Sequence, residues 1–206
     1  PFSVATWNAR VLLTEDKVSA AKKVRWALKS AASHTHTLIQ ELGGDEAEIR
    51  EFARKQRHTH FVGWSRGNGA ARGVLSLHRR KDFVNGATAN FVEVVLGRAL
   101  MSCIKDAKGS STVFNIHNFD IDKEGLIALN RAIGIALADA RECPTSKLVF
   151  IAGDMNFSFK EKPALRLPSY TADENIGRAT AFKYSALKRT LSAATLVGHD
   201  RFSHFN

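Results

Sequence analysis

Apolar residues recur along this chain in short runs, and the most compact run is Leu148–Ala152. It is unbroken and rich in strand-forming residues, which predicts a strand buried on both faces. Gly153 should then break the strand, leaving Asp154 and Asn156 at its carboxyl end. Alternation along an extended chain would point these two polar side chains the same way. An Asx-rich turn that merely closes a core strand is the other interpretation of this segment.

Other segments have the apolar or alternating pattern of strands. We expect further strands at Phe2–Trp7, His34–Gln40, Phe61–Trp64, Gly73–His78, Val92–Leu96, Arg98–Ile104, Thr112–His117 and, at the end of the chain, Arg201–Asn206. Asn8, Glu41 and His117 each lie at the carboxyl end of one of these strands. A buried Glu41 would need a cation or a hydrogen-bond donor, and a solvent-facing Glu41 would not, so both placements stay open.

Several segments between the predicted strands have the apolar spacing of helices. After the candidate N-caps Thr14 and Asp16, apolar residues recur at helical spacing, namely Val18, Ala21, Val24, Leu28 and Ala31. A short helix is expected at Asp45–Gln56, with Ile49, Phe52 and Ala53 buried. Asp122 can cap a long helix whose core face carries Leu126, Leu129, Ile133, Leu137 and Ala140, and a last helix is expected at Ala181–Ala194.

These elements predict an α/β sandwich in one domain, 1–206, because strands in hairpin-like pairs are interrupted by few helices. The sheets should be mixed or largely antiparallel. Asn8, Glu41, His117, and Asp154 with Asn156 follow separate strands. If those strands are neighbours in two packed sheets, all five side chains converge on one rim.

The composition supports a substantial core and a polyanionic partner. The chain has 206 residues, 44% of them hydrophobic, and a formal net charge of +10 with a pI near 9.9. Such a charge is typical of nucleic-acid binding, although a solvated basic surface or an organelle or membrane address would also produce it. Arg10, Arg66 and Arg72 are the candidate nucleic-acid contacts. The first helix also carries a basic stripe, which comprises Lys17, Lys22, Lys23, Arg25 and Lys29. Such a stripe could contact phosphate, but basic helix faces are more often solvated.

Cysteine and histidine spacing gives no metal-binding motif. Cys103 and Cys143 fit neither a metal site nor a disulfide framework, which favours a reducing, intracellular compartment such as the nucleus or an organelle. His58 and His60 have no third ligand nearby and are expected to be surface or strand residues. No apolar run approaches the ~20 residues that cross a bilayer.

Five short motifs occur together in the order and spacing of a known family. They are Thr-Trp-Asn, Leu-Ile-Gln-Glu, Arg-Gly-Val-Leu-Ser-Leu, Phe-Asn-Ile-His-Asn and Gly-Asp-Met-Asn. In these motifs the chain resembles the endonuclease/exonuclease/phosphatase superfamily over nearly its whole length. Within the superfamily, the motifs are most similar to those of LINE-type retrotransposon endonucleases. The resemblance implies a four-layer α/β/β/α sandwich with a divalent-metal phosphoesterase site at one edge.

The resemblance also implies roles for particular residues. Glu41 matches the metal-binding Glu of the family, and Asn8 the Asn that helps to position the metal and the phosphate. Asp154 matches the Asp that orients the attacking water, and Asn156 its neighbour that contacts the scissile phosphate. His117 stands where many members have Tyr, and could donate a hydrogen bond or a proton, or simply be a buried and paired histidine. The expected cofactor is Mg²⁺ (or Mn²⁺), which needs few protein carboxylates.

The family's closing Asp and Ser-Asp-His motifs, which supply the general base, are not found in these residues. The resemblance therefore implies that the C-terminal part of the family domain is absent. Two functions follow as alternatives. The chain is the larger part of a metal-dependent nuclease acting on DNA or RNA, or it is a degenerate member that serves as a basic scaffold binding RNA or other subunits of a large assembly.

Overall fold

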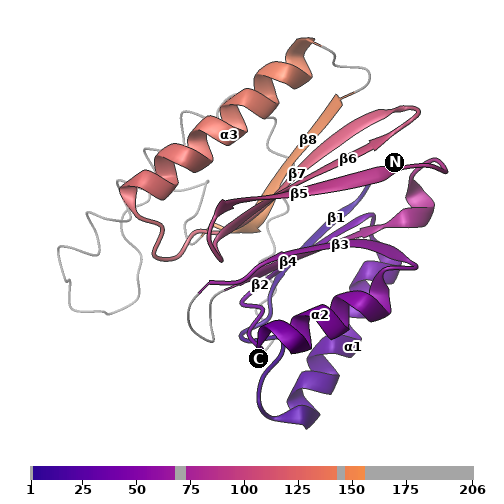
Figure 1. Cartoon of the computed structure of the whole chain (residues 1–206), viewed down its shortest axis with the longest axis vertical. Helices are drawn as coiled ribbons and strands as arrows, with labels where there is room; N and C mark the ends of the chain where they lie inside the picture. The colour runs from indigo at the N-terminus through magenta and orange to yellow at the C-terminus, as the bar shows by residue number, and fades with distance from the viewer. Residues whose placement is uncertain (1, 68–72, 143–146, 156–206) are drawn as a thin grey trace.

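Two four-stranded sheets lie face to face between outer helices in the computed structural model, which describes residues 2–67, 73–142 and 147–155 (Figure 1). The first sheet has the order β1 (Val4–Asn8), β2 (His36–Gln40), β4 (Val74–Arg79), β3 (His60–Ser65). The second has the order β5 (Thr88–Val95), β6 (Ala99–Asp106), β7 (Gly109–His117), β8 (Lys147–Asp154). The helices are α1 (Lys17–Ser33), α2 (Glu46–Gln56) and α3 (Lys123–Glu142), with a short 3-10 turn at Arg80–Asp82.

The four layers of the predicted sandwich are present. Helices α1 and α2 cover the outer face of the first sheet, and α3 covers the outer face of the second (Figure 1). Both sheets are mixed, because β1 is parallel to β2 and β7 is parallel to β8, while the other neighbouring strands are antiparallel. The predicted α/β fold and its mixed, largely antiparallel sheets are therefore confirmed for the described residues.

The parallel pairs place polar residues at one end of the sandwich. Asn8 is in register with Gln40 at the end of the β1–β2 pair, and His117 with Asp154 at the end of the β7–β8 pair. Parallel strands have their carboxyl ends at the same sheet edge. Strands β1 and β8 also contact each other across the two sheets. The topology thus brings four strand ends to one rim.

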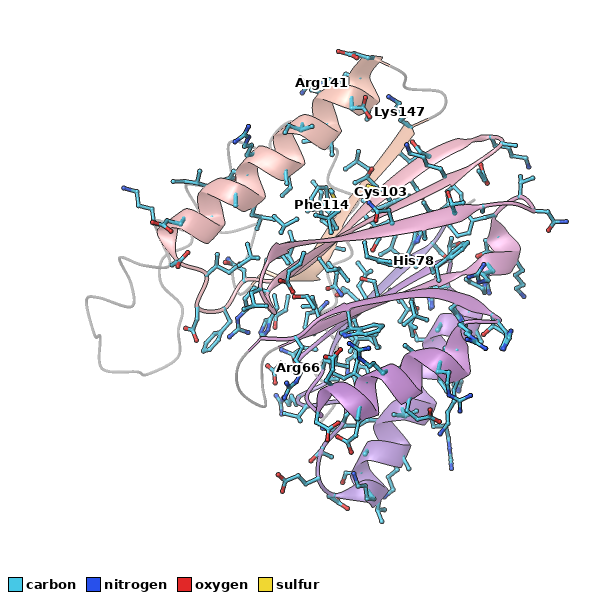
Figure 2. All side chains as sticks on the ribbon, in the orientation of Figure 1. Arg66, His78, Cys103, Phe114, Arg141 and Lys147 are labelled. Atoms are coloured by element: carbon cyan, nitrogen blue, oxygen red, sulfur yellow. The ribbon has the colours of Figure 1, made fainter. Side chains whose placement is uncertain are left out.

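Apolar side chains fill the three spaces between the layers. One cluster lies between the first sheet and its helices and includes Leu42 and Ile49, and another lies between the second sheet and α3 and includes Phe114 and Leu129. Figure 2 shows Phe114 on the α3 side of its sheet. The third cluster, between the sheets, includes Leu38. The buried faces predicted for α2 and for the first half of α3 are confirmed.

A polar network crosses the inter-sheet core. Gln40 Nε2 donates to Asn115 Oδ1 at 2.7 Å, and Asn115 Nδ2 donates to the backbone oxygens of Leu75 at 2.9 Å and Ile39 at 3.2 Å. Gln40 and Asn115 are fully buried, and such groups are tolerated inside a protein only when hydrogen-bonded. The network therefore connects β7 of one sheet to β2 and β4 of the other.

The structure corrects two predictions about the strand before Asp154. Leu148 is 42% exposed, and β8 lies at the edge of its sheet among the described strands, so it is not buried on both faces. Gly153 does not break the strand, which continues to Asp154. Gly153 pairs with Ile116 at φ 140°, and an added Cβ would lie 1.9 Å from the Ile116 carbonyl oxygen. Only glycine permits this close backbone approach.

The face predicted for the first helix is also wrong in part. Asp16 caps α1 as expected, but Val18 is 66% exposed and Ala21 is exposed, whereas Ala27 and Ala31 are buried. Val18 and Ala27 are nine positions apart, about two and a half helical turns, so they point to opposite sides of the helix. No helix of the described residues is long and apolar enough to cross a membrane. The predicted helix 181–194 and the strand 201–206 lie outside these residues.

Candidate active site

Four of the predicted site residues meet at the rim formed by β1, β2, β7 and β8. Asn8 ends β1, Glu41 follows β2, His117 ends β7 and Asp154 ends β8. The side chain of His117 is 3% exposed and that of Glu41 is 20% exposed, while Asn8 and Asp154 are half-buried. The convergence predicted from the strand ends is present in the structure. Asn156, the fifth member, lies outside the described residues.

The Asn8 amide joins the two carboxylates. Its Nδ2 donates to Glu41 Oε1 and to Asp154 Oδ2, each at 2.9 Å. Its Oδ1 accepts from the backbone N–H of Arg10 at 3.0 Å. A carboxylate only accepts hydrogen bonds and a backbone N–H only donates them. These contacts therefore fix the orientation of the amide, with its nitrogen toward Glu41 and Asp154 and its oxygen toward Arg10. The placement of Glu41 left open by the sequence is thus decided, since the carboxylate has a donor partner.

Left-handed backbone conformations surround this arrangement. Arg10, Val11 and Glu41 have φ of 47°, 66° and 58°, a region that costs residues with a Cβ about 1–2 kcal/mol each. Ala9 N–H donates to the Gln40 oxygen at 3.0 Å, so the bend after β1 is anchored to β2. Such strain persists only where the surroundings impose it, and it is concentrated at functional sites.

Lys23 stabilises the same bend. Its Nζ donates to the carbonyl oxygens of Arg10 and of Val11, the latter at 3.0 Å. Of the basic stripe of α1, for which contact with phosphate and solvation were both left open, Lys23 thus contacts the backbone of the bend after β1. Its position one helical turn before Ala27, on the half-buried side of α1, directs the ammonium toward the loop after β1.

His117 has a defined protonation state. Its Nδ1 lies 2.8 Å from Arg98 Nη1, and its Nε2 lies 3.8 Å from Glu41 Oε1. Burial, and next the Arg98 charge, lower the pKa of His117 below its usual value. A guanidinium can only donate, so Nδ1 accepts and the neutral imidazole carries its proton on Nε2. The ring therefore presents an N–H toward the rim.

Arg98 is a site residue that the sequence reasoning missed. Its side chain is 5% exposed, and besides His117 it lies 3.7 Å from Asp120 Oδ2. Its backbone oxygen accepts from His117 N–H at 2.7 Å. The available signal was alternation: Arg98 has the same parity as the buried Leu100 and Ile104 and therefore points inward.

The turn after β7 is tied to the end of β8. The Asn118 backbone N–H donates to the backbone carbonyl oxygen of Asp154 at 2.8 Å. The Asn118 side-chain Nδ2 donates to the backbone carbonyl oxygen of Met155 at 2.9 Å. Phe119 N–H donates back to the His117 oxygen at 2.8 Å, and Asp120 has φ 54°. His117 and Asp154 are thus positioned by one connected piece of backbone.

In the comparisons with known proteins, this chain matches solved structures but neither a family model nor a curated protein sequence. A truncated Caenorhabditis elegans TDP2 is 18% identical with a TM-score of 0.51, and the match covers 82% of this chain and 66% of that one. TDP2 is a member of the endonuclease/exonuclease/phosphatase superfamily. The chain has the fold of this superfamily.

Two D. rerio TDP2 structures show weaker similarity. A humanized form is 14% identical with a TM-score of 0.49, and covers 77% of this chain and 67% of that chain. A complex with a single-strand DNA product is 16% identical with a TM-score of 0.48, and covers 76% of this chain and 61% of that chain. The chain thus spans 61 to 67% of the lengths of these three proteins.

Two arginines predicted to contact nucleic acid lie at the end of the superfamily fold that carries the rim. Arg10 is exposed and follows Asn8 by two positions. Arg66 is exposed after β3, which runs in the same direction as β2, and its Nε donates to the Gly44 oxygen at 3.0 Å (Figure 2). Arg72 lies outside the described residues. Contact of these arginines with nucleic acid stays a prediction.

The donor atoms at the rim suit a hard divalent cation. Glu41 and Asp154 supply two carboxylates that share one neutral amide, and Mg²⁺ prefers a few oxygen ligands completed by water and phosphate oxygens. No cluster of three or more His, Cys, Asp or Glu side chains that could bind a metal occurs in the described ranges. Asn8 presents its nitrogen to the carboxylates, so its predicted role as a metal ligand would require the amide to turn over.

Proposed function

We propose that this chain carries a metal-dependent phosphodiesterase site that cleaves nucleic acid, in the manner of a retroelement or repair-type endonuclease. The main support is the joint placement of Asn8, Glu41, Asp154 and His117 at one rim. Two half-buried carboxylates bridged by one amide, beside a neutral imidazole N–H, form a site suited to a cation and to a phosphate.

Glu41, assisted by Asp154, is the residue that would bind Mg²⁺ (or Mn²⁺). When bound, such an ion acts as a Lewis acid on the phosphoryl group and stabilises the leaving oxygen. The left-handed Glu41 backbone and its bond to Asn8 direct the carboxylate toward Asp154. Asn8 therefore positions both carboxylates, whether or not its own oxygen reaches the ion.

Asp154 and His117 have complementary roles toward the phosphate. Asp154 accepts a hydrogen bond from the attacking water and orients it toward phosphorus. The water oxygen forms the new bond to phosphorus as the bond to the ester oxygen breaks, the water gives up a proton to solvent, and the leaving oxygen takes a proton from solvent. His117 donates from Nε2–H to a phosphoryl oxygen, because Arg98 occupies Nδ1. Such fixed donors contribute strongly where charge develops in the transition state. Asn156, outside the described residues, is proposed to contact the same phosphate.

A polymeric anion is the substrate that the charge favours. The net charge of +10 attracts a phosphate backbone, and the exposed Arg10 and Arg66 lie at the same end of the molecule as the carboxylates. Arginine recognises phosphate through several hydrogen-bond donors, so these two residues would position the strand.

The test is nuclease activity of the 206-residue chain with Mg²⁺ on supercoiled plasmid and on labelled single-stranded DNA and RNA. Asp154→Asn and Glu41→Gln should each abolish cleavage. Asp139→Asn is the matched control, because Asp139 is an exposed carboxylate paired with Lys147 on the surface. Cleavage that survives both site substitutions would refute the assigned site. Tight nucleic-acid binding without any cleavage would favour the scaffold function instead.

A further inference from the structure

Phe119 presents an aromatic ring at the edge of the candidate site. It is 51% exposed and follows His117 by two positions. Single exposed apolar side chains are common on protein surfaces and usually need no explanation. This one differs because its position is fixed by the groups that form the site.

Three contacts fix the ring. It lies nearly parallel to the imidazole of His117, with an interplanar angle of 17° and 6.0 Å between ring centroids. The Arg98 guanidinium carbon lies 5.4 Å from the ring centroid. The Phe119 backbone N–H donates to the His117 oxygen at 2.8 Å. Arg98 and His117 thus position Phe119 as well as each other.

The turn that carries Phe119 is anchored on both sides. Asn118 is bonded to the end of β8, and the left-handed Asp120 lies 3.7 Å from Arg98. A side chain in such a turn loses little further freedom when a ligand binds, and this preorganisation favours recognition. About half of the surface of Phe119 nevertheless remains exposed to solvent.

We propose that Phe119 is a stacking site for a nucleobase of the substrate, adjacent to the phosphate bound at Asp154 and His117. This inference rests on the proposed function and extends it to a substrate class. Every base has a π-face that can stack on an aromatic side chain, and such stacking is largely independent of sequence. The positive net charge would bind the backbone while Phe119 binds the base.

Stacking on Phe119 requires a base whose face is available. In a duplex each face is covered by its neighbours, whereas single strands, ends and flipped nucleotides expose it. The site should therefore bind single-stranded or unpaired nucleic acid more tightly than a continuous duplex. A small phosphate ester without a ring would gain nothing from this contact.

The experiment measures affinity for a short labelled single strand by fluorescence anisotropy, in EDTA so that no cleavage occurs. Phe119→Ala and Phe119→Leu should weaken binding by about tenfold, within the range known for loss of one stacked base. Phe119→Trp should retain the affinity. Ile135→Ala is the matched control, because Ile135 is 62% exposed on α3. The variants should lose no affinity for an otherwise identical strand of abasic residues.

Either of two results would overturn the inference. Equal affinity of the wild type and Phe119→Ala for normal strands would exclude stacking. Full affinity of Phe119→Leu would show a merely apolar contact. Failure of the proposed function is distinguishable, because stacking without any cleavage would leave this inference intact. If Phe119→Ala cleaves nucleic acid with an unchanged KM, the stacking inference is refuted while the proposed function stands.

Discussion

The guanidinium of Arg98 donates from Nη1 to Nδ1 of His117 across 2.8 Å inside the protein, and this bond determines what the imidazole offers to the site. Arg98 has no acceptor and does not lose its charge. His117 is consequently neutral, with its proton on Nε2, and is unsuited to accept a proton from water through either nitrogen. Its role at the rim is that of a hydrogen-bond donor.

The first prediction concerns this tautomer. At pH 7.5, nitrogen-detected NMR of the imidazole should show one neutral form with the proton on Nε2. Arg98→Met should allow both tautomers and raise the pKa of His117, because Arg98 is one of the causes that lower it. Arg131→Met, which changes an exposed arginine of α3, should leave the His117 signals unchanged. A single Nε2–H form that persists without Arg98 would disprove this account.

A second prediction separates stability from metal binding at the carboxylates. Glu41 and Asp154 share one amide donor and repel each other, so Glu41→Gln should raise the melting temperature without metal by about 2–4 °C. Mg²⁺ should raise the melting temperature of the wild type but not that of Glu41→Gln. Thermal unfolding with and without Mg²⁺ measures both effects, with Asp139→Asn as the control. An equal response to Mg²⁺ in both proteins would place the ion elsewhere.

A third prediction follows from the close approach of β8 to β7. Gly153→Ala would place a methyl group 1.9 Å from the Ile116 oxygen, at a φ of 140° that alanine disfavours. The backbones must separate, so we expect a loss of about 3 kcal/mol or more in the free energy of unfolding. Gly134→Ala is the matched control, because no atom lies near its added Cβ and it lies inside α3. It should stabilise the chain by about 0.5–1 kcal/mol. Urea unfolding compares the two variants.

The layout of the site could be predicted from the sequence because it depends on local patterns. Strand alternation and the polar residue after each strand identify Asn8, Glu41, His117 and Asp154, and the parallel pairing of β1 with β2 and of β7 with β8 brings them together. The prediction required only the periodicity of each strand and the assumption that the strands are neighbours.

The details that set the chemistry depend on contacts between distant segments, which local patterns do not contain. The orientation of the Asn8 amide requires Arg10, Glu41 and Asp154 at once. Glycine usually breaks a strand, yet β8 continues through Gly153. The Ile116 backbone lies so close to Gly153 that a side chain there would clash with it. Arg98 was missed because a charged residue at a strand start is ordinarily solvated.

A fourth prediction tests the polar network between the sheets. Asn115→Ala removes the acceptor of Gln40 Nε2 on β7, so that among the described residues the Gln40 side chain keeps only its bonds with Thr6, and it removes the Asn115 donor from the Leu75 oxygen. We expect a loss of about 2–4 kcal/mol in the free energy of unfolding. Asn90→Ala, an exposed asparagine of β5, should change the stability by less than about 0.5 kcal/mol. Urea unfolding at neutral pH measures both. A small effect of Asn115→Ala would show that the apolar contacts alone hold the sheets together.

The last prediction concerns a histidine pair in the inter-sheet core, away from the rim. His36 and His78 lie with their Nδ1 atoms 2.9 Å apart, and both are fully buried. The Nε2 of each is buried and has no hydrogen-bond partner among the residues that the structure describes. Figure 2 shows His78 in the layer between the sheets. Burial lowers the pKa of His36 to about 4, and burial together with His36 lowers that of His78 well below its usual value.

The sign of the pH effect follows from the direction of these two pKa shifts. Below pH 6.5 the unfolded chain binds protons at both residues while the folded chain does not, so stability falls as the pH falls from 6.5 toward 4. His36 alone, with a folded pKa of about 4, should remove about 2 kcal/mol between pH 7.5 and pH 5. Urea unfolding at the two pH values measures this loss. His36→Phe should reduce it, whereas His58→Gln, at an exposed position, should not. Because His36 begins β2 and Glu41 follows its other end, the pair is separated from the rim by the length of the strand. A loss that depends on Mg²⁺ would instead assign the acid sensitivity to the rim.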